Sequence, residues 1–132
     1  MTAIPRHAII LFAHGSRDPA WRVPIEAVAA RMRELQPQAL VRCAYLELTA
    51  PDLATVMHEV HEAGARAATI WPLFFGAGRH VREDLPRLAA QLRTNFPAMR
   101  ISVQAPIAEN AQVLEVMART ALLSAQNQEQ PV

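Results

Sequence analysis

Two of the five histidines follow apolar, strand-like stretches of the sequence. His14 comes directly after residues 8–13, and His80 comes shortly after a stretch that ends at residue 74. Glu47 follows a third such stretch. Two imidazoles and a carboxylate can hold a divalent transition metal and leave coordination positions open. The same groups can take up protons, because histidine titrates near neutral pH.

Each candidate also has a purely structural explanation. A histidine at a strand end is often a hydrogen-bonded loop residue, and Glu47 could cap a following helix near Thr49. Ser16 could be a turn residue, and Arg17 and Asp18 could form a surface ion pair of little energetic value. A functional site therefore requires that the candidates converge in the fold.

The remaining histidines do not favour a site. His58 and His61 resemble a metal motif but lie three residues apart, whereas the histidines of an HExxH zinc motif lie four apart. The apolar residues around them mark the opposite face of a helix, so we expect both on a solvated face. His7 stands at the start of its strand, away from the other candidates. Gly15 stands alone rather than in a GxGxxG pattern, which disfavours dinucleotide binding.

The elements that would position the candidates are readable from hydrophobic periodicity. Continuous apolar runs, typical of strands buried on both faces, alternate four times with helical patterns. This order predicts an α/β fold: a four-stranded parallel sheet flanked by helices on both faces, a flavodoxin-like three-layer sandwich with strand order 2-1-3-4. Ligands of such folds bind beyond the carboxyl ends of strands 1 and 3, where the winding direction switches. The expected strands are 6–13, 40–46, 67–74 and 99–105, and the expected helical stripes run from Trp21 to Leu35, Leu53 to Val60, Val81 to Phe96 and Val113 to Ala121.

Length and composition limit the class of protein. At 132 residues we expect one domain over residues 1–125, followed by a polar, disordered tail at 126–132. Hydrophobic residues make up 52% of the chain and charged residues 19%, which excludes a disordered polar chain. No apolar run approaches the ~18 residues of a membrane span, and the start lacks a signal-peptide core, so we expect a cytoplasmic protein without a membrane partner. Cys43 is the only cysteine, which excludes an internal disulfide and a multi-cysteine zinc site.

The basic residues are all of one type. All 13 are Arg, and the net charge is +1. Because there is no basic run, nucleic acid is not an expected partner. The lack of lysine excludes Schiff-base and Walker-type ATP chemistry, so an anion site must use Arg, backbone N–H groups or hydroxyls.

Three segments, in this order and at this spacing, resemble the CbiX/SirB family of sirohydrochlorin chelatases. They are HGSRDP at 14–19, YLELTAPDL at 45–53 and PLFFGAGRHVREDLP at 72–86. The resemblance extends over roughly residues 9–107 and implies a chelatase-like sandwich. The length is similar to that of the short, single-domain form of the family, which corresponds to one half of the longer class II chelatases.

The resemblance implies ATP-independent insertion of Co²⁺ or Fe²⁺ into the tetrapyrrole sirohydrochlorin, with Ni²⁺ as a further candidate and no other cofactor. His14 and His80 would bind the metal or accept pyrrole protons, and Glu47 would assist. Because the substrate carries eight carboxylates, hydroxyl and guanidinium groups near the site would hold its rim. The candidate substrate-binding residues are Ser16, Arg17, Gly76, Gly78, Arg79 and Arg82.

Two other function classes stay open: a non-catalytic metal or tetrapyrrole carrier, and a flavodoxin-like domain that binds a small anion. The choice among cobalt, iron and nickel, and between sirohaem and cobalamin synthesis, also stays open, because nitrogen and oxygen sites follow one general affinity order.

We expect a homodimer. A tetrapyrrole is large for one four-stranded sheet, ligand sites bury ~70–90% of their ligand, and a second copy related by a two-fold axis would supply the missing wall.

Overall fold

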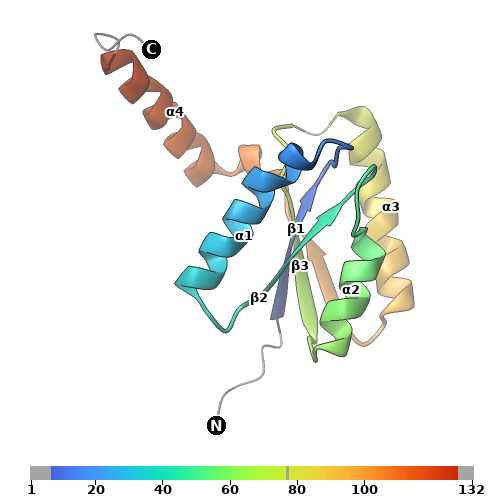
Figure 1. Cartoon of the computed structure of the whole chain (residues 1–132). Helices are drawn as coiled ribbons and strands as arrows, with labels where there is room; N and C mark the ends of the chain where they lie inside the picture. Colours follow the sequence, from blue (N-terminus) through green and yellow to red (C-terminus); the bar gives the residue numbers. More distant parts are fainter. Residues whose placement is uncertain (1–6, 77, 128–132) are drawn as a thin grey trace.

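The strands form one parallel sheet in the predicted order. The computed structural model describes residues 7–76 and 78–127, apart from the side chain of His80. The sheet order is β2-β1-β3-β4, and all three pairs are parallel (Figure 1). The fold class and the strand order are therefore confirmed. The four strands are β1 (His7–Ala13), β2 (Leu40–Tyr45), β3 (Ala67–Pro72) and β4 (Arg100–Val103).

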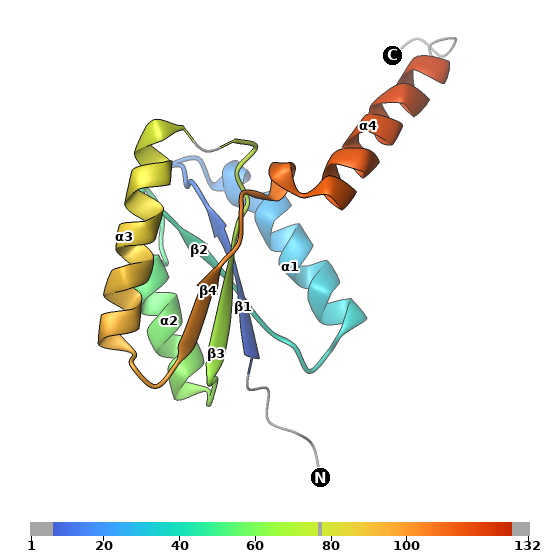
Figure 2. The ribbon, with the colours of Figure 1, turned by 180° about the vertical axis from the view of Figure 1, so that it is seen from behind.

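Three of the four α-helices cover the two faces of the sheet. Helix α1 (Val23–Leu35) lies on one face, and α2 (Leu53–Glu62) and α3 (Arg79–Asn95) lie on the other (Figures 1 and 2). The larger apolar core lies between the sheet and α2 and α3, around Phe12, Ile70 and Met57. A smaller core around Leu11 and Val41 lies under α1. None of the helices in the described part of the chain is long and apolar enough to cross a membrane.

Helix α1 does not bury the stripe that the sequence suggested. The segment begins with a short 3-10 helix, η1 (Pro19–Arg22), and Pro24 lies in the first turn of α1. Trp21 is 67% exposed and Leu35 is 65% exposed. The contact instead centres on Ala29, which is fully buried because its small side chain lets the helix approach the sheet closely. Of the predicted stripe, Ile25 and Met32 are partly buried and pack against this core, whereas Trp21, Val28 and Leu35 are exposed.

Helix α3 contains Pro86 in its interior and is nevertheless continuous from Arg79 to Asn95. The helix therefore begins well before the proline. Pro86 has no N–H and cannot donate to the carbonyl of Arg82, four residues earlier.

The last helix differs most from expectation. Helix α4 (Ala111–Gln126) follows a short 3-10 helix, η2 (Ile107–Glu109), and contains no buried residue. It leaves the carboxyl edge of the sheet and projects away from it (Figures 1 and 2). Its expected role as a covering helix is therefore wrong within this chain. The helix also includes Gln126, which was expected to begin the tail, and residues 128–132 lie outside the described residues.

Candidate functional site

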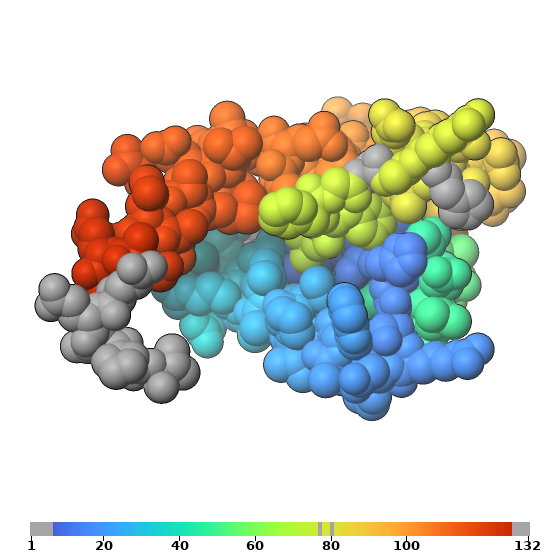
Figure 3. All heavy atoms as spheres, turned by 90° about the horizontal axis from the view of Figure 1, so that it is seen from above, coloured from blue at the N-terminus to red at the C-terminus, as the bar shows by residue number. Residues whose placement is uncertain are grey.

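The carboxyl ends of β1 and β2 continue as two paired loops. The amide of Leu46 donates to the carbonyl of Ala13 at 2.9 Å, and the amide of Glu47 donates to the carbonyl of His14 at 3.1 Å. The parallel ladder thus extends beyond both strands. His14 and Glu47 are placed side by side at the edge where the predicted site lies, which Figure 3 views from above.

Gly15 permits this close approach of the two loops. Its φ of +96° lies in the left-handed region that glycine adopts readily. A Cβ at this position would stand 2.0 Å from the carbonyl oxygen of Glu47. Any other residue would force the loops apart, so the glycine is a structural requirement of the site.

His14 and Glu47 form an ion-pair contact. The Nε2 of His14 lies 3.0 Å from the Oε1 of Glu47, and the two side chains are 57% and 52% exposed. The ring of His14 also stands edge-on to the buried ring of Phe74, with centroids 6.3 Å apart. A carboxylate only accepts, so Nε2 carries the proton, and in the neutral imidazole Nδ1 carries the lone pair. Such a carboxylate partner fixes the tautomer and the orientation of an imidazole.

His80 is the second residue of α3, whose N-cap is Gly78. This helix follows β3, the neighbour of β1, so the backbone of His80 belongs to the same edge of the sheet. Its side chain lies outside the described residues, and its convergence with His14 stays a prediction. Among the described residues, no three His, Cys, Asp or Glu side chains lie close enough together to hold a metal ion.

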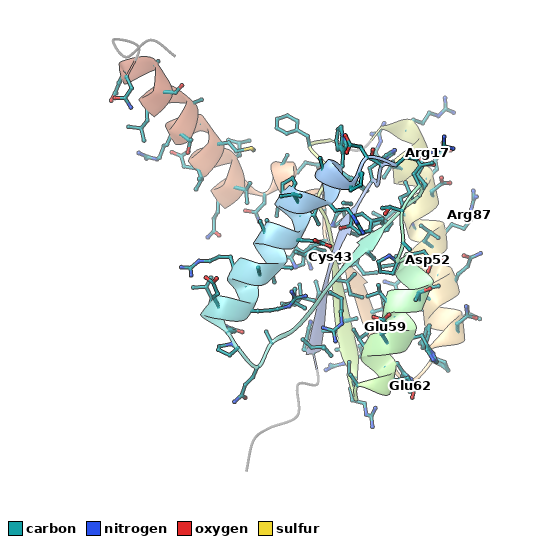
Figure 4. All side chains as sticks on the ribbon, viewed as in Figure 1. Arg17, Cys43, Asp52, Glu59, Glu62 and Arg87 are labelled. Atoms are coloured by element: carbon teal, nitrogen blue, oxygen red, sulfur yellow. The ribbon has the colours of Figure 1, made fainter. Side chains whose placement is uncertain are left out.

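The candidate arginines differ in their contacts. Arg17 is exposed at the carboxyl edge (Figure 4). Arg79 is exposed but pairs with Glu83 at 3.2 Å along its own helix. Arg82 is exposed and lines a groove of about 360 Å³ between α3 and the end of β4. All three stay predictions as substrate-binding residues.

Among the small candidate residues, Ser16 has a structural role, and Gly76 and Gly78 have no steric one within this chain. The hydroxyl oxygen of Ser16 accepts a hydrogen bond from the amide of Asp18 at 3.1 Å, so it has the turn role that the sequence allowed. Gly76 and Gly78 have only open space where a side chain would stand. Sterics within this chain therefore do not require glycine at either position.

Two of the acidic residues near this edge cap helices, and Glu47 is not one of them. Asp52, not Glu47, caps α2, because its Oδ1 accepts from the amide of Thr55 at 2.8 Å. The hydrogen bonds with Thr55 lower the pKa of Asp52. Asp18 caps η1 by accepting from the amide of Ala20 at 3.0 Å. The capping hypothesis for Glu47 is thus wrong, which leaves its contact with His14.

The other histidines lie apart from this edge. His58 is exposed and lies 4.0 Å from Glu62 on the same helix, as expected. His61 is only partly exposed, because its ring packs against Phe96 with centroids 5.6 Å apart. His7 lies at the amino end of β1 and contacts the hydroxyl of Thr69 at 2.6 Å. Cys43 lies between the sheet and α1 (Figure 4), and burial raises the pKa of its thiol.

Sequence periodicity missed the apolar residues that the structure exposes near the site. Phe75 is 83% exposed and follows the ring that packs on His14. Leu48, next to Glu47, is 54% exposed and has a φ of 66°. A leucine in the left-handed region is strained, and such strain is often found at functional sites. The sequence feature that could have indicated Leu48 and Phe75 is their position three residues beyond the ends of β2 and β3.

Tyr45, the last residue of β2, is 2% exposed. Its hydroxyl has no hydrogen-bond partner in the part of the chain that the structure describes. The residue lines a pocket of about 200 Å³ together with His14, Ser16 and Arg22. Burial raises the pKa of Tyr45. A buried hydroxyl without a partner is uncommon and marks this pocket as unusual.

Proteins of similar sequence indicate the family of the chain. The CbiX family model matches residues 8–122. Among curated relatives, the chloroplastic sirohydrochlorin ferrochelatase of Arabidopsis thaliana is 27% identical over 83% of this chain and 48% of its own length. The sirohydrochlorin cobaltochelatase of Methanopyrus kandleri is 28% identical over 61% of this chain and 57% of its own length. The chain thus spans about half the length of these two relatives. It spans 85% of the sirohydrochlorin cobaltochelatase of Sulfolobus acidocaldarius, at 25% identity over 83% of this chain.

Solved structures give the same assignment. A putative cobalamin (vitamin B12) biosynthesis CbiX protein from Marinobacter aquaeolei superposes with a TM-score of 0.80 at 32% identity, covering 92% of this chain and 98% of that one. The sirohydrochlorin chelatase SirB from Bacillus subtilis in complex with cobalt gives a TM-score of 0.69 at 25% identity, covering 77% and 44%. Because the family model matches most of its length and these structures superpose on it, the chain belongs to the CbiX family.

Proposed function

We propose that this chain inserts a divalent metal ion, Co²⁺ or Fe²⁺, into sirohydrochlorin. The observation that carries the proposal is the 3.0 Å contact between His14 Nε2 and Glu47 Oε1 at the carboxyl edge of the sheet. Membership of the CbiX family, and relatives named as cobaltochelatase and ferrochelatase, supply the substrate class.

The chemistry needs a ligand and a base at one place. Metal insertion removes two pyrrole N–H protons and replaces the water around the ion with four pyrrole nitrogens. The neutral imidazole of His14 binds the ion through Nδ1, or accepts a proton there, while Glu47 stabilises the imidazolium that forms. His80, the second residue of α3, would supply a second imidazole. No ATP is consumed, in keeping with a chain that contains no lysine for a P-loop.

The surroundings of the pair suit a large, flat, acidic substrate. The exposed side chains of Leu48 and Phe75 offer apolar surface to the macrocycle. Arg17, Arg79 and Arg82 provide cationic groups for the peripheral carboxylates, and guanidinium groups bind carboxylates through paired hydrogen bonds.

The deciding experiment follows sirohydrochlorin absorbance after addition of Co²⁺, Fe²⁺ or Ni²⁺, with and without protein. Catalysed turnover with at least one metal, lost in His14→Ala, supports the proposal. Stoichiometric binding of tetrapyrrole or metal without acceleration would identify a carrier instead. Metal-independent binding of a phosphate ester, with no effect on sirohydrochlorin, would identify a small-anion-binding domain.

We also propose that the functional unit is a homodimer. The described edge of the sheet forms a floor for a tetrapyrrole, but one chain supplies little to cover its opposite face. A second copy related by a two-fold axis would add that wall near the site. Light scattering across a concentration series tests this, and a fully active species of 14.6 kDa at every concentration would contradict it.

A further inference from the structure

Helix α4 is apolar around most of its circumference and yet buries nothing in its own chain. Leu122 is 66% exposed, Val116 is 62% exposed, and Leu114 is 53% exposed. Four of its six polar side chains share a narrow arc at positions 112, 115, 119 and 126, where Glu115 and Arg119 pair at 3.0 Å. The other two, Thr120 and Ser124, are small and lie outside this arc. A helix that is apolar on most sides is normally buried. The single chain therefore leaves α4 without the contact that its sequence requires.

The sheet carries a matching gap. Helix α1 packs on one face against β1 and β2, while α2 and α3 share the other face (Figures 1 and 2). Over β3 and β4, on the same side as α1, the described residues place no helix. Trp71 is only partly buried there, and Ser102 on β4 is exposed. A fourth helix of the three-layer sandwich would occupy this half of the face.

We propose that α4 of one copy packs on the open half-face over β3 and β4 of a second copy, and that the second copy returns its own α4 in the same way. This inference rests on the homodimer of the proposed function and specifies the two surfaces that form its interface. Both surfaces belong to one chain, so a single two-fold axis satisfies both at once. Helix α4 leaves from the carboxyl edge (Figure 1), so the exchange brings the two candidate sites toward the interface.

The size of the contact is sufficient for a stable dimer. Helix α4 has 16 residues. We treat α4 as a cylinder about 24 Å long and about 10 Å wide, of which half the lateral surface is buried. Counting both exchanged helices and the two sheet faces that receive them, the dimer removes on the order of 1,500 Å² of surface from water. This is the area of a standard stable interface. The paired arc of Glu115 and Arg119 would remain in solvent.

The first experiment measures mass by light scattering, without metal or tetrapyrrole. Met117 lies within the apolar part of α4, and Gln112 lies in its polar arc. Met117→Glu is expected to weaken the dimer at least tenfold, while the matched control Gln112→Glu places the same charge in the same helix and leaves it intact. Equal dissociation constants for both variants would overturn the proposal, as would a monomeric wild-type chain.

The second experiment identifies which surface receives the helix. In a Cys43→Ser background, one chain carries Met117→Cys and a co-expressed, differently tagged chain carries Ser102→Cys. A short bismaleimide is expected to link the two chains, with Gln112→Cys in place of Met117→Cys giving at least fivefold less product. A dimer without this product would overturn the exchange, because another surface would then form the interface. A link inside a monomeric double variant would also overturn it, by showing that α4 folds back onto its own sheet.

These readouts are independent of catalysis. A chain that turns over sirohydrochlorin but fails both experiments would contradict only the exchange of α4. A chain that passes both but shows no turnover would contradict only the proposed activity.

Discussion

The Nε2 of His14 and the Oε1 of Glu47 lie 3.0 Å apart, although the two residues belong to loops 33 positions apart in the sequence. Backbone hydrogen bonds beyond β1 and β2 hold those loops together, and Gly15 gives them the room to approach. The pair is therefore built by the backbone and is in place before any substrate binds.

His14→Ala is expected to lower the rate of metal insertion by about 10²–10⁴-fold, because it removes both a ligand and a base. His80→Ala is expected to have a similar effect. The measurement is initial rate with Co²⁺ and sirohydrochlorin, with circular dichroism to establish that each variant folds. His58→Ala is the matched control, since His58 is exposed on α2 away from this edge. A large loss in the control, or folded site variants with near-normal rates, would contradict the assignment.

Glu47→Gln is expected to reduce activity by about 10–100-fold, the usual range for a carboxylate that orients a working imidazole. The amide keeps the shape of the side chain but cannot stabilise an imidazolium. If Glu47 acts through His14, the double variant His14→Ala, Glu47→Gln loses no more than His14→Ala alone. Additive losses would show instead that Glu47 acts on the substrate independently.

The rate of metal insertion is expected to fall as the pH drops from about 8 to about 5, because the uncharged imidazole is the working form. The measurement is kcat/KM as a function of pH, corrected for the titration of sirohydrochlorin itself. A flat profile in the unmodified chain would exclude histidine as ligand or base.

Tyr45→Phe is expected to raise the free energy of unfolding by about 1 kcal/mol, because it removes a buried hydroxyl that has no partner among the described residues. Burial raises the pKa of Tyr45. The native state therefore loses stability when the pH rises above the ordinary range of tyrosine, and the advantage of the phenylalanine variant grows there. Urea unfolding near neutral and at alkaline pH measures both effects. A destabilised variant would mean that the hydroxyl has a stabilising partner.

Asp52→Ala is expected to lower the free energy of unfolding by about 1 kcal/mol, because Asp52 caps α2 through the amide of Thr55. The hydrogen bonds that lower the pKa of Asp52 are made by its carboxylate. The stabilisation is thus present above the unfolded pKa and is lost as the pH falls through the lower folded value. Asp52→Asn, which retains a capping oxygen, is the control. An effect of Asp52→Ala that persists undiminished in strong acid would contradict this account.

The sequence by itself determined the architecture and the edge of the sheet at which the candidate site lies. Continuous apolar runs alternating with helical patterns leave few arrangements, since parallel strands need right-handed crossovers. The order β2-β1-β3-β4 is the flavodoxin-like arrangement of such strands, and it places His14 and Glu47 beyond neighbouring strands. The caps formed by Asp18 and Asp52 are local as well, because each joins residues only two or three positions apart.

Only the tertiary structure decided how helices rotate and where the last one goes. A helical stripe fixes which residues share a face but not which part of that face meets the sheet, so Ala29 rather than Trp21 makes the contact of α1. The same pattern that predicted a covering helix at α4 is present, but the turn through η2 directs it away from its own sheet. Hydrophobic periodicity indicates only that one face of a helix must be buried. What buries it depends on the path of the connecting backbone and on the surfaces within reach, and neither is local in sequence.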